Sequence, residues 1–168
     1  MISALLVGGA IYYLQVYGYY HEIAASAPAA EIRMTTVEGA VEPVLIEGFQ
    51  GIDAESSPIR FRACFHTPQS MAMLTETYQV YEKAEPLVAP SWFSCFDAEA
   101  IGEALEQGRA TAYLGEANIK YGIDRVVVVM DDGRAFAWNQ INACGAVVFN
   151  GDPAPEDCPV PPPVPPKE

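Results

Sequence analysis

The stretch that decides the fold is "DRVVVVMDDGRAFAWNQI", residues 124–141. Two runs of mostly apolar residues, 124–130 and 134–141, flank the sequence Asp131-Asp132-Gly133. Valine and aromatic side chains suit the surface of a β-sheet, and glycine adopts the positive φ of a tight turn at little cost. The stretch therefore predicts a β-hairpin.

Similar patterns predict further elements on both sides of this hairpin. A helix is expected over 97–108, with Asp97 as its N-terminal cap and Gly108 as its stop. Residues 70–82 are ambiguous, because Ser70 could cap a helix while the Thr, Tyr and Val that follow prefer a strand. Additional strands are predicted over 31–39, 42–52, 57–67 and 145–149. Strands joined by short turns, with one or two helices, predict an α+β fold with a mainly antiparallel sheet and helix on one face.

The chain begins with an apolar segment that carries no full charge before Glu22. Nineteen residues, 2–20, suffice for a helix that crosses a bilayer, and five tyrosines in their second half suit the membrane–water interface. We therefore predict a transmembrane helix over 1–21. A signal peptide cleaved after Ala25-Ser26-Ala27 is disfavoured because no basic residue precedes the apolar run. A buried helix is disfavoured because no polar face is visible.

The rest of the chain divides by composition. Residues 22–31 are interpreted as a linker, 32–152 as the α+β domain and 153–168 as a proline-rich, extended tail.

Small and polar residues within the predicted anchor suggest contact with another membrane helix. Small side chains at helical spacing let two helices approach closely, and a polar side chain can form a hydrogen bond between them. The alternative is a helix that faces lipid. The candidate helix-packing residues are Ala4, Gly8, Gly9, Tyr13, Gln15 and Tyr17.

The net charge of −13 belongs wholly to the chain from Glu22 onward. Such a surface repels nucleic acid, which excludes nucleic-acid binding as a function. It attracts basic proteins, and a basic soluble electron carrier is one such partner.

The four cysteines are Cys64, Cys95, Cys144 and Cys158, and none forms a Cys-x-x-Cys pair. An even number of scattered cysteines after an export-like segment favours disulfides in an oxidising compartment, here the periplasm. Of three possible pairings we favour Cys64–Cys95 with Cys144–Cys158. The alternative is four free thiols on the cytoplasmic side.

The strand predicted over 57–67 alternates apolar with polar side chains. Ile59, Phe61, Ala63 and Phe65 fall on one face, and Arg60, Arg62, Cys64 and His66 fall on the other. Arg60 and Arg62, with His66, are a candidate ligand-binding group for a carboxylate or phosphate. The alternative is that both arginines pair internally with carboxylates such as Asp53 or Glu55.

Copper binding is a weaker hypothesis for the same region. Cys64, His66, Met71 and Met73 offer the soft sulfur and imidazole ligands that Cu(I) prefers, provided that Cys64 is reduced.

Motifs for catalysis are scarce. The sequence has no Gly-x-Ser-x-Gly elbow, no glycine-rich phosphate loop and no paired-histidine metal motif, and His66 is the only credible general base of the domain. We expect no enzymatic activity, no catalytic residues and no cofactor.

Six stretches together resemble an uncharacterised family of small single-pass bacterial inner-membrane proteins with a periplasmic domain, some of which carry a histidine-kinase label. This chain has no room for an ATP-binding domain, so the label is not supported, and no activity follows from the resemblance. The stretches are "YYLQVYGYY" (12–20), "SSPIRFRACF" (56–65), "MLTETYQVYEKAEPL" (73–87), "CFDAEAIGEALEQGRA" (95–110), "YGIDRVVVVMDDGRAFAWNQINACG" (121–145) and "NGDPAPEDC" (150–158).

These observations favour an accessory subunit or assembly partner of a larger inner-membrane complex, with a respiratory or electron-transfer complex as the preferred example. Two alternatives stay open: a copper-handling assembly factor, and a periplasmic ligand-binding or sensing domain that uses Arg60 and Arg62.

Overall fold

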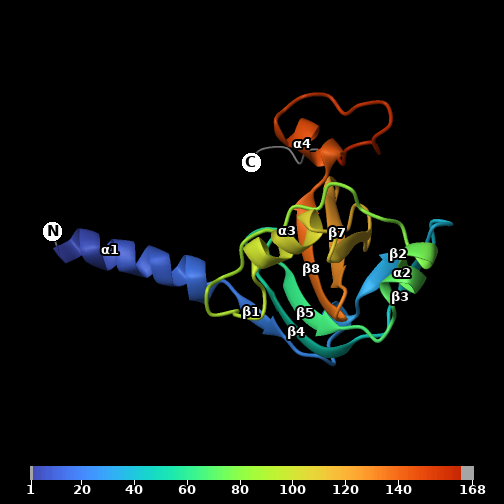
Figure 1. Ribbon diagram of the computed structural model, residues 1–168. Helices are drawn as coiled ribbons and strands as arrows, with labels where there is room; N and C mark the ends of the chain where they lie inside the picture. Colours follow the sequence, from blue (N-terminus) through green and yellow to red (C-terminus); the bar gives the residue numbers. More distant parts are fainter. Residues whose placement is uncertain (1, 164–168) are drawn as a thin grey trace.

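The structure is a computed structural model that describes residues 2–163. An N-terminal helix projects from an α+β domain, and a lobe formed by the last helix and the tail rises from the far end of the sheet (Figure 1). In chain order the elements are α1 (Ile2–Tyr13), η1 (Leu14–Gly18), β1 (His21–Ile23), η2 (Pro28–Ala30), β2 (Arg33–Thr35), β3 (Val41–Pro43), β4 (Glu47–Asp53), β5 (Arg62–His66), α2 (Met71–Thr77), α3 (Ala98–Glu106), β6 (Ala110–Leu114), β7 (Ile123–Met130), β8 (Arg134–Ile141) and α4 (Ala143–Phe149).

The main sheet has six strands in the order β1-β4-β5-β8-β7-β6, and every neighbouring pair is antiparallel. β2 and β3 form a separate antiparallel pair. The predicted hairpin is confirmed as β7 and β8, with Val127 opposite Ala137 and with Gly133 at φ 85° in the turn. The predicted α+β class with a mainly antiparallel sheet is also confirmed.

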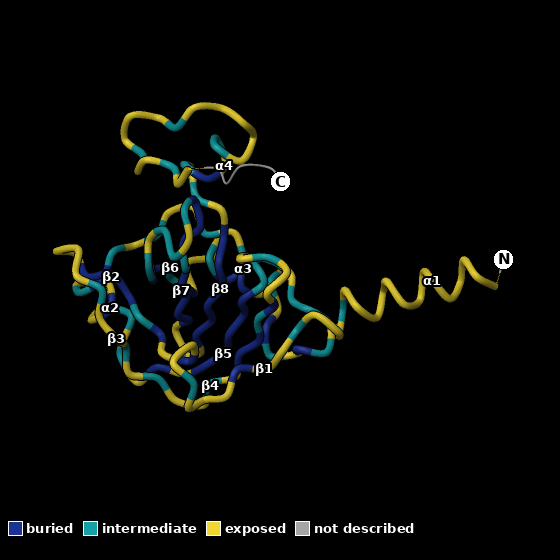
Figure 2. The backbone as a smooth tube through the Cα atoms, turned by 180° about the vertical axis from the view of Figure 1, so that it is seen from behind, coloured by how far each residue is buried: buried dark blue, intermediate teal, exposed yellow. Residues whose placement is uncertain are grey.

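Both faces of the main sheet are buried. Val127 and Val129 of β7 point into one core, which includes Leu74 of α2, whereas Val126 and Val128 point into a second core, which includes Ile101 of α3. Figure 2 shows the strands as the buried centre of the domain. The unbroken run of valines is explained by this double burial, since a strand covered on both sides needs no polar face. The expectation of helix on one face is therefore wrong, because α2 and α3 cover opposite faces.

The predicted end signals of the helices are confirmed. The Asp97 side chain accepts a hydrogen bond from the amide of Ala100 at 3.1 Å, and Gly108 has φ 69° just beyond α3. Ser70 caps α2 by accepting from the amide of Met73 at 3.3 Å. The ambiguous stretch 70–82 thus begins as a helix and then turns extended, with an isolated bridge between Tyr78 and Thr36.

The strand predicted over 145–149 is wrong, because these residues belong to α4. The Asn142 side chain accepts from the amide of Gly145 at 2.9 Å and so starts a helix directly after β8. Gly145 then packs against the backbone of Gly122, where a Cβ atom would overlap the Gly122 carbonyl oxygen. Glycine at both positions allows this approach, which a sequence pattern does not reveal.

The interpretation of 22–31 as a linker also needs correction. His21–Ile23 forms β1 and pairs with β4, with Ile23 opposite Gly51, and the side chains of Ile23 and Ala30 are buried in the first core. This stretch is part of the domain because its apolar side chains complete that core.

The described part of the proline-rich tail, residues 153–163, has no helix or strand, but the prediction that it is extended is wrong at 156–158, where the chain turns and the amide of Cys158 donates to the carbonyl of Pro155 at 3.0 Å. It is held by the Cys144–Cys158 disulfide and by a 3.0 Å hydrogen bond from the Tyr121 hydroxyl to the Pro159 carbonyl. Residues 164–168 of the predicted tail lie outside the described residues.

The contact between Gly122 and Gly145 provides a test of the α4 position. We expect Gly145→Ala to lower the free energy of unfolding by about 2 kcal/mol, the cost of an overpacked contact. Gly102→Ala in α3 is the matched control, because its Cβ would meet no atom within 4 Å and alanine favours a helix by about 0.5–1 kcal/mol. Urea unfolding of both variants measures the difference, and equal stability of the two would contradict the packing described.

Candidate functional site

The N-terminal helix α1 is an apolar surface that the domain does not cover. Its large side chains are exposed, with Leu5 at 77% and Leu6 at 70%, and it carries no charged residue (Figure 2). The predicted packing residues Ala4, Gly8 and Gly9 lie on this open surface, and a Cβ on either glycine would meet nothing within 4 Å. Among the elements within residues 2–163, α1 stands out because its apolar side chains are exposed and pack against no other part of the protein along most of the helix.

The predicted uninterrupted helix over 1–21 is not observed. α1 ends at Tyr13, and Leu14–Gly18 forms a π-helix, in which the amide of Tyr19 donates to the carbonyl of Leu14 at 3.0 Å. In the described part of the chain, no helix combines the length and the apolar character that crossing a membrane requires.

Trp92 holds the end of this helical segment against the domain. Its indole Nε1 donates to the carbonyl of Val16 at 2.7 Å. Its ring stacks on Tyr17 at 6.3 Å between centroids, meets the edge of Tyr20 at 6.1 Å, and Tyr17 in turn stacks on Tyr13 at 5.7 Å. Two of the predicted helix-packing residues, Tyr13 and Tyr17, thus belong to an aromatic contact with the protein's own domain, whereas Gln15 is exposed. We call Tyr13, Tyr17, Tyr20 and Trp92 the aromatic collar.

The loop that carries Trp92 is fixed by the buried Arg62 of β5. The Arg62 Nε and Nη2 atoms donate to the carbonyls of Leu87 and Val88 at 2.9 and 3.1 Å, and Nη1 donates to those of Ile59 and Phe61 at 2.8 and 2.7 Å. Burial lowers the pKa of Arg62 to about 10, so the group stays charged at neutral pH. A charged donor that bonds four carbonyls ties the loop firmly to the sheet.

Two further contacts from the same region reinforce the junction. Cys64, two residues after Arg62 on the same face of β5, forms the predicted disulfide with Cys95. Arg60 donates from Nη1 to the Tyr20 hydroxyl at 3.2 Å, and its Cζ lies 5.5 Å from the Tyr20 ring centroid. Arg62 and Cys64 therefore hold the loop that carries Trp92, and Arg60 holds Tyr20, which follows the helical segment.

The predicted ligand-binding group is not assembled. The Arg62 guanidinium is occupied by backbone carbonyls, Arg60 contacts Tyr20, and His66 is exposed at the other end of β5, opposite Glu47 and Arg134. The alternative of pairing with Asp53 or Glu55 is also wrong, since neither arginine makes such an ion pair among the described residues. The predicted alternation of faces is right for residues 61–65, but the partners are backbone and aromatic groups.

The copper hypothesis is contradicted by the oxidation state of Cys64. A sulfur bonded to Cys95 is not a thiolate ligand. Met71 packs against the first core, and Met73 is exposed beside Gln69. Across residues 2–163, no three His, Cys, Asp or Glu side chains come together as a metal-binding group.

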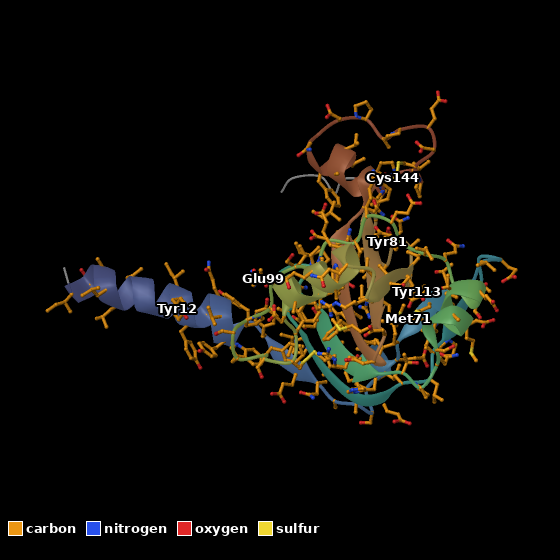
Figure 3. The ribbon with its side chains drawn as sticks, viewed as in Figure 1. Tyr12, Met71, Tyr81, Glu99, Tyr113 and Cys144 are labelled. Carbon is orange, nitrogen blue, oxygen red and sulfur yellow. A yellow bond between two sulfur atoms is a disulfide. The ribbon has the colours of Figure 1, made fainter. Side chains whose placement is uncertain are left out.

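A buried polar network beneath α4 was missed from the sequence. Asp124 accepts from the amide of Asn118 at 2.9 Å, from the Asn142 side chain at 2.8 Å and from the Tyr81 hydroxyl at 3.0 Å. Burial, and next the Asp124 charge, raise the pKa of Tyr81 above its ordinary value. A cleft of about 830 Å³ lies beside the network, and Figure 3 shows Tyr81 below Cys144 of α4. Because the network's groups bond one another, we assign it to holding the loops and α4.

In the sequence, this network is indicated only by an asparagine, Asn118, that is followed by the acidic residue Asp124. Asn118 adopts φ 50°, a conformation that asparagine tolerates better than most residues, and its side chain accepts from the amide of Gly122 at 2.9 Å. An asparagine in the loop before a strand whose second residue is acidic is too common a pattern to identify a network.

In comparisons with known proteins, the model of a family of unknown function, DUF6446, matches residues 32–159, which include β2 to α4 and Cys158 but neither α1 nor β1. No curated protein and no solved structure matches.

The bond between Trp92 and Val16 can be tested by amide hydrogen exchange. We expect Trp92→Phe to speed exchange of the amides of residues 16–20 about five-fold, the effect of losing a hydrogen bond worth about 1 kcal/mol. Tyr17→Phe keeps the stacked ring and removes a hydroxyl that forms no hydrogen bond in residues 2–163, so its exchange should match the unmodified protein. Unchanged exchange in Trp92→Phe would show that the collar does not hold the helix.

Proposed function

The chain belongs to the DUF6446 family of unknown function, and from the site itself we propose that it is a membrane-anchored interaction protein. In this proposal α1 inserts into the bacterial inner membrane beside helices of a larger complex. The acidic domain lies in the periplasm as an accessory subunit or assembly partner. The observation that carries the proposal is the exposed, uncharged surface of α1, in which no residue is buried.

The composition of α1 supports a lipid and protein environment. Exposed apolar surface is unfavourable in water by roughly 25 cal/mol per Å². The 12 residues of α1 rise about 18 Å, less than the ~30 Å of a bilayer's hydrocarbon layer. A short apolar helix is accommodated by neighbouring helices or by local thinning of the bilayer. Gly8 and Gly9, open on the surface, suit close approach of such a neighbour.

The aromatic collar fits the boundary between membrane and water. Tyrosine and tryptophan concentrate at that level because their rings are apolar and their polar groups still reach water. The collar lies where α1 meets the domain, so insertion of α1 would bring it to the membrane surface. The bond from Trp92 to Val16 would then fix the angle between domain and membrane.

The domain's acidic charges remain available to a partner. The chain has 22 acidic residues, yet the described part of it contains just two ion pairs, Glu31–Arg33 and Asp132–Arg134, each between near neighbours in sequence. Unpaired carboxylates of this number favour a basic partner surface, of which a basic electron carrier is one example. The two disulfides suit the periplasm, where such bonds form and persist.

Membrane attachment is tested by placing one charge on α1. We expect Leu6→Arg to move the protein from the carbonate-resistant membrane fraction to the soluble fraction, since a central arginine opposes insertion by about 2.5–3.5 kcal/mol. Val88→Arg is the control, because Val88 is 80% exposed in the domain and the variant should stay with the membrane. An unmodified protein released by carbonate would refute attachment.

Association with a larger complex is tested through the two glycines. We expect the unmodified protein, solubilised in digitonin, to migrate in blue native gels well above its own 18.2 kDa. The double variant Gly8→Leu/Gly9→Leu should stay in the membrane but migrate as a small species, because bulky side chains prevent close helix approach. Migration of the unmodified protein as a small species would exclude the subunit role while leaving membrane attachment intact.

A further inference from the structure

A second cavity lies at the same end of the sheet as the polar network, where β7 begins, but on the other face, because the neighbouring residues Arg125 and Asp124 point to opposite faces of the strand. It has a volume of about 290 Å³. Five segments contribute to it: the start of β1, the end of β4 with the loop that follows, the loop before β7, the start of β7, and β8. The polar side chains that line it and matter here are His21, Asp53, Glu55, Lys120, Arg125 and Asn139.

Arg125 is held rigidly in the wall of this cavity. Its Cζ lies 3.6 Å from the centroid of the Phe61 ring, and its Nε donates to the Asn139 Oδ1 at 2.8 Å. Asn139 is itself fixed, because its Nδ2 donates to the carbonyl of Pro58 at 2.8 Å. The stem of Arg125 also packs on Gly115, where a Cβ would come within 2.7 Å of the Arg125 Cγ. The guanidinium plane is thus positioned in advance of any contact with a ligand.

The outer edge of this guanidinium is unpaired. In the described residues, the Nη1 and Nη2 atoms of Arg125 form no hydrogen bond and no ion pair, whereas all three nitrogens of Arg62 donate to carbonyls. Burial lowers the pKa of Arg125 to about 10, and the nearby charges of Glu116 and Asp53 oppose that decrease. Arg125 is therefore charged at neutral pH, with two donor nitrogens and no protein acceptor.

The remaining charges of the cavity form two groups of opposite sign. Lys120 is exposed at the rim and adds a second cation. Asp53 and Glu55 line the same cavity, but neither carboxylate comes within the 4 Å of an ion pair with Arg125 or Lys120. Separated cations and anions around one small cavity match a ligand that itself carries both charges.

We propose that this cavity binds a small zwitterion. The carboxylate or phosphate of the ligand accepts from the Nη atoms of Arg125, in the forked geometry that guanidinium favours, and is drawn further by Lys120. Its primary ammonium pairs with Asp53 and Glu55. The volume is at the small end of the range for ligand sites, which suits a free amino acid or the phosphoethanolamine head group of a lipid. The site lies within the domain and does not rest on membrane attachment.

The test is isothermal titration of the full chain in an uncharged detergent. The probes are L-alanine and O-phosphoethanolamine, with propionate and ethylamine as analogues that carry one charge each. We expect at least one zwitterion to bind ten-fold or more tightly than either single-charge analogue. Preference for alanine identifies a free amino acid. Preference for phosphoethanolamine, with competition by phosphatidylethanolamine vesicles, identifies a lipid head group.

Two variants test separately the contacts with the anionic and the cationic group of the ligand. Arg125→Gln should weaken binding of the preferred zwitterion at least ten-fold, and Arg109→Gln is the control, because Arg109 is exposed and bonded to Gln107 at 2.9 Å. Asp53→Asn leaves the Arg125 stack intact and should abolish the preference for the zwitterion over propionate. This variant decides the question if Arg125→Gln does not fold. Failure of both zwitterions to bind more tightly than their analogues, or unchanged binding in Asp53→Asn, would overturn the proposal.

Discussion

The buried guanidinium of Arg62 is the constraint on which the site depends. By donating to the carbonyls of Leu87 and Val88, it gives a loop without regular secondary structure a fixed position on the sheet. The neighbouring Cys64–Cys95 bond fixes the same loop a few residues further on. Trp92 lies between these two points and donates to the Val16 carbonyl at 2.7 Å. The attachment of α1 to the domain is therefore controlled by one strand, β5.

The sheet provides the rigid base for these contacts. β8 lies between β5 and β7, and the apolar side chains of β7 enter both cores, so the centre of the sheet is covered on both faces. Because both faces are apolar, the register of β7 and β8 is set by the turn at Gly133 and by the fit of each side chain in its own core. The loops and helices around the sheet are thereby held in place: the aromatic collar beside edge strand β1, and α4 with its polar network where β7 begins and β8 ends.

The three proposed interaction surfaces differ in the chemistry of their side chains. α1 offers uncharged, mostly apolar side chains, the domain carries more acidic than basic residues, and the cavity at Arg125 is lined by side chains of both charges. Each surface suits a different environment: lipid and apolar helices, a basic protein, and a small zwitterion. The proposed roles are compatible because the three surfaces are made by different segments of the chain.

The sequence alone determined several local features: the hairpin of β7 and β8, the cap Asp97 and the alternating faces of β5. It offered Ser70 as a cap and favoured, among three possible disulfide pairings, the one that the structure has. These depend on neighbours in the chain or on a small set of cysteines. It also identified the apolar character of the first residues, but not the π-helix that ends α1. Tertiary structure decided that 145–149 is a helix and that 22–31 belongs to the domain. It also decided that Arg62 fastens a loop, that Arg60 contacts Tyr20, and that the Nη atoms of Arg125 have no acceptor among the described residues. Those outcomes depend on which carbonyl, ring or glycine of a distant segment lies nearby. The periodicity of residues along the chain does not predict such contacts.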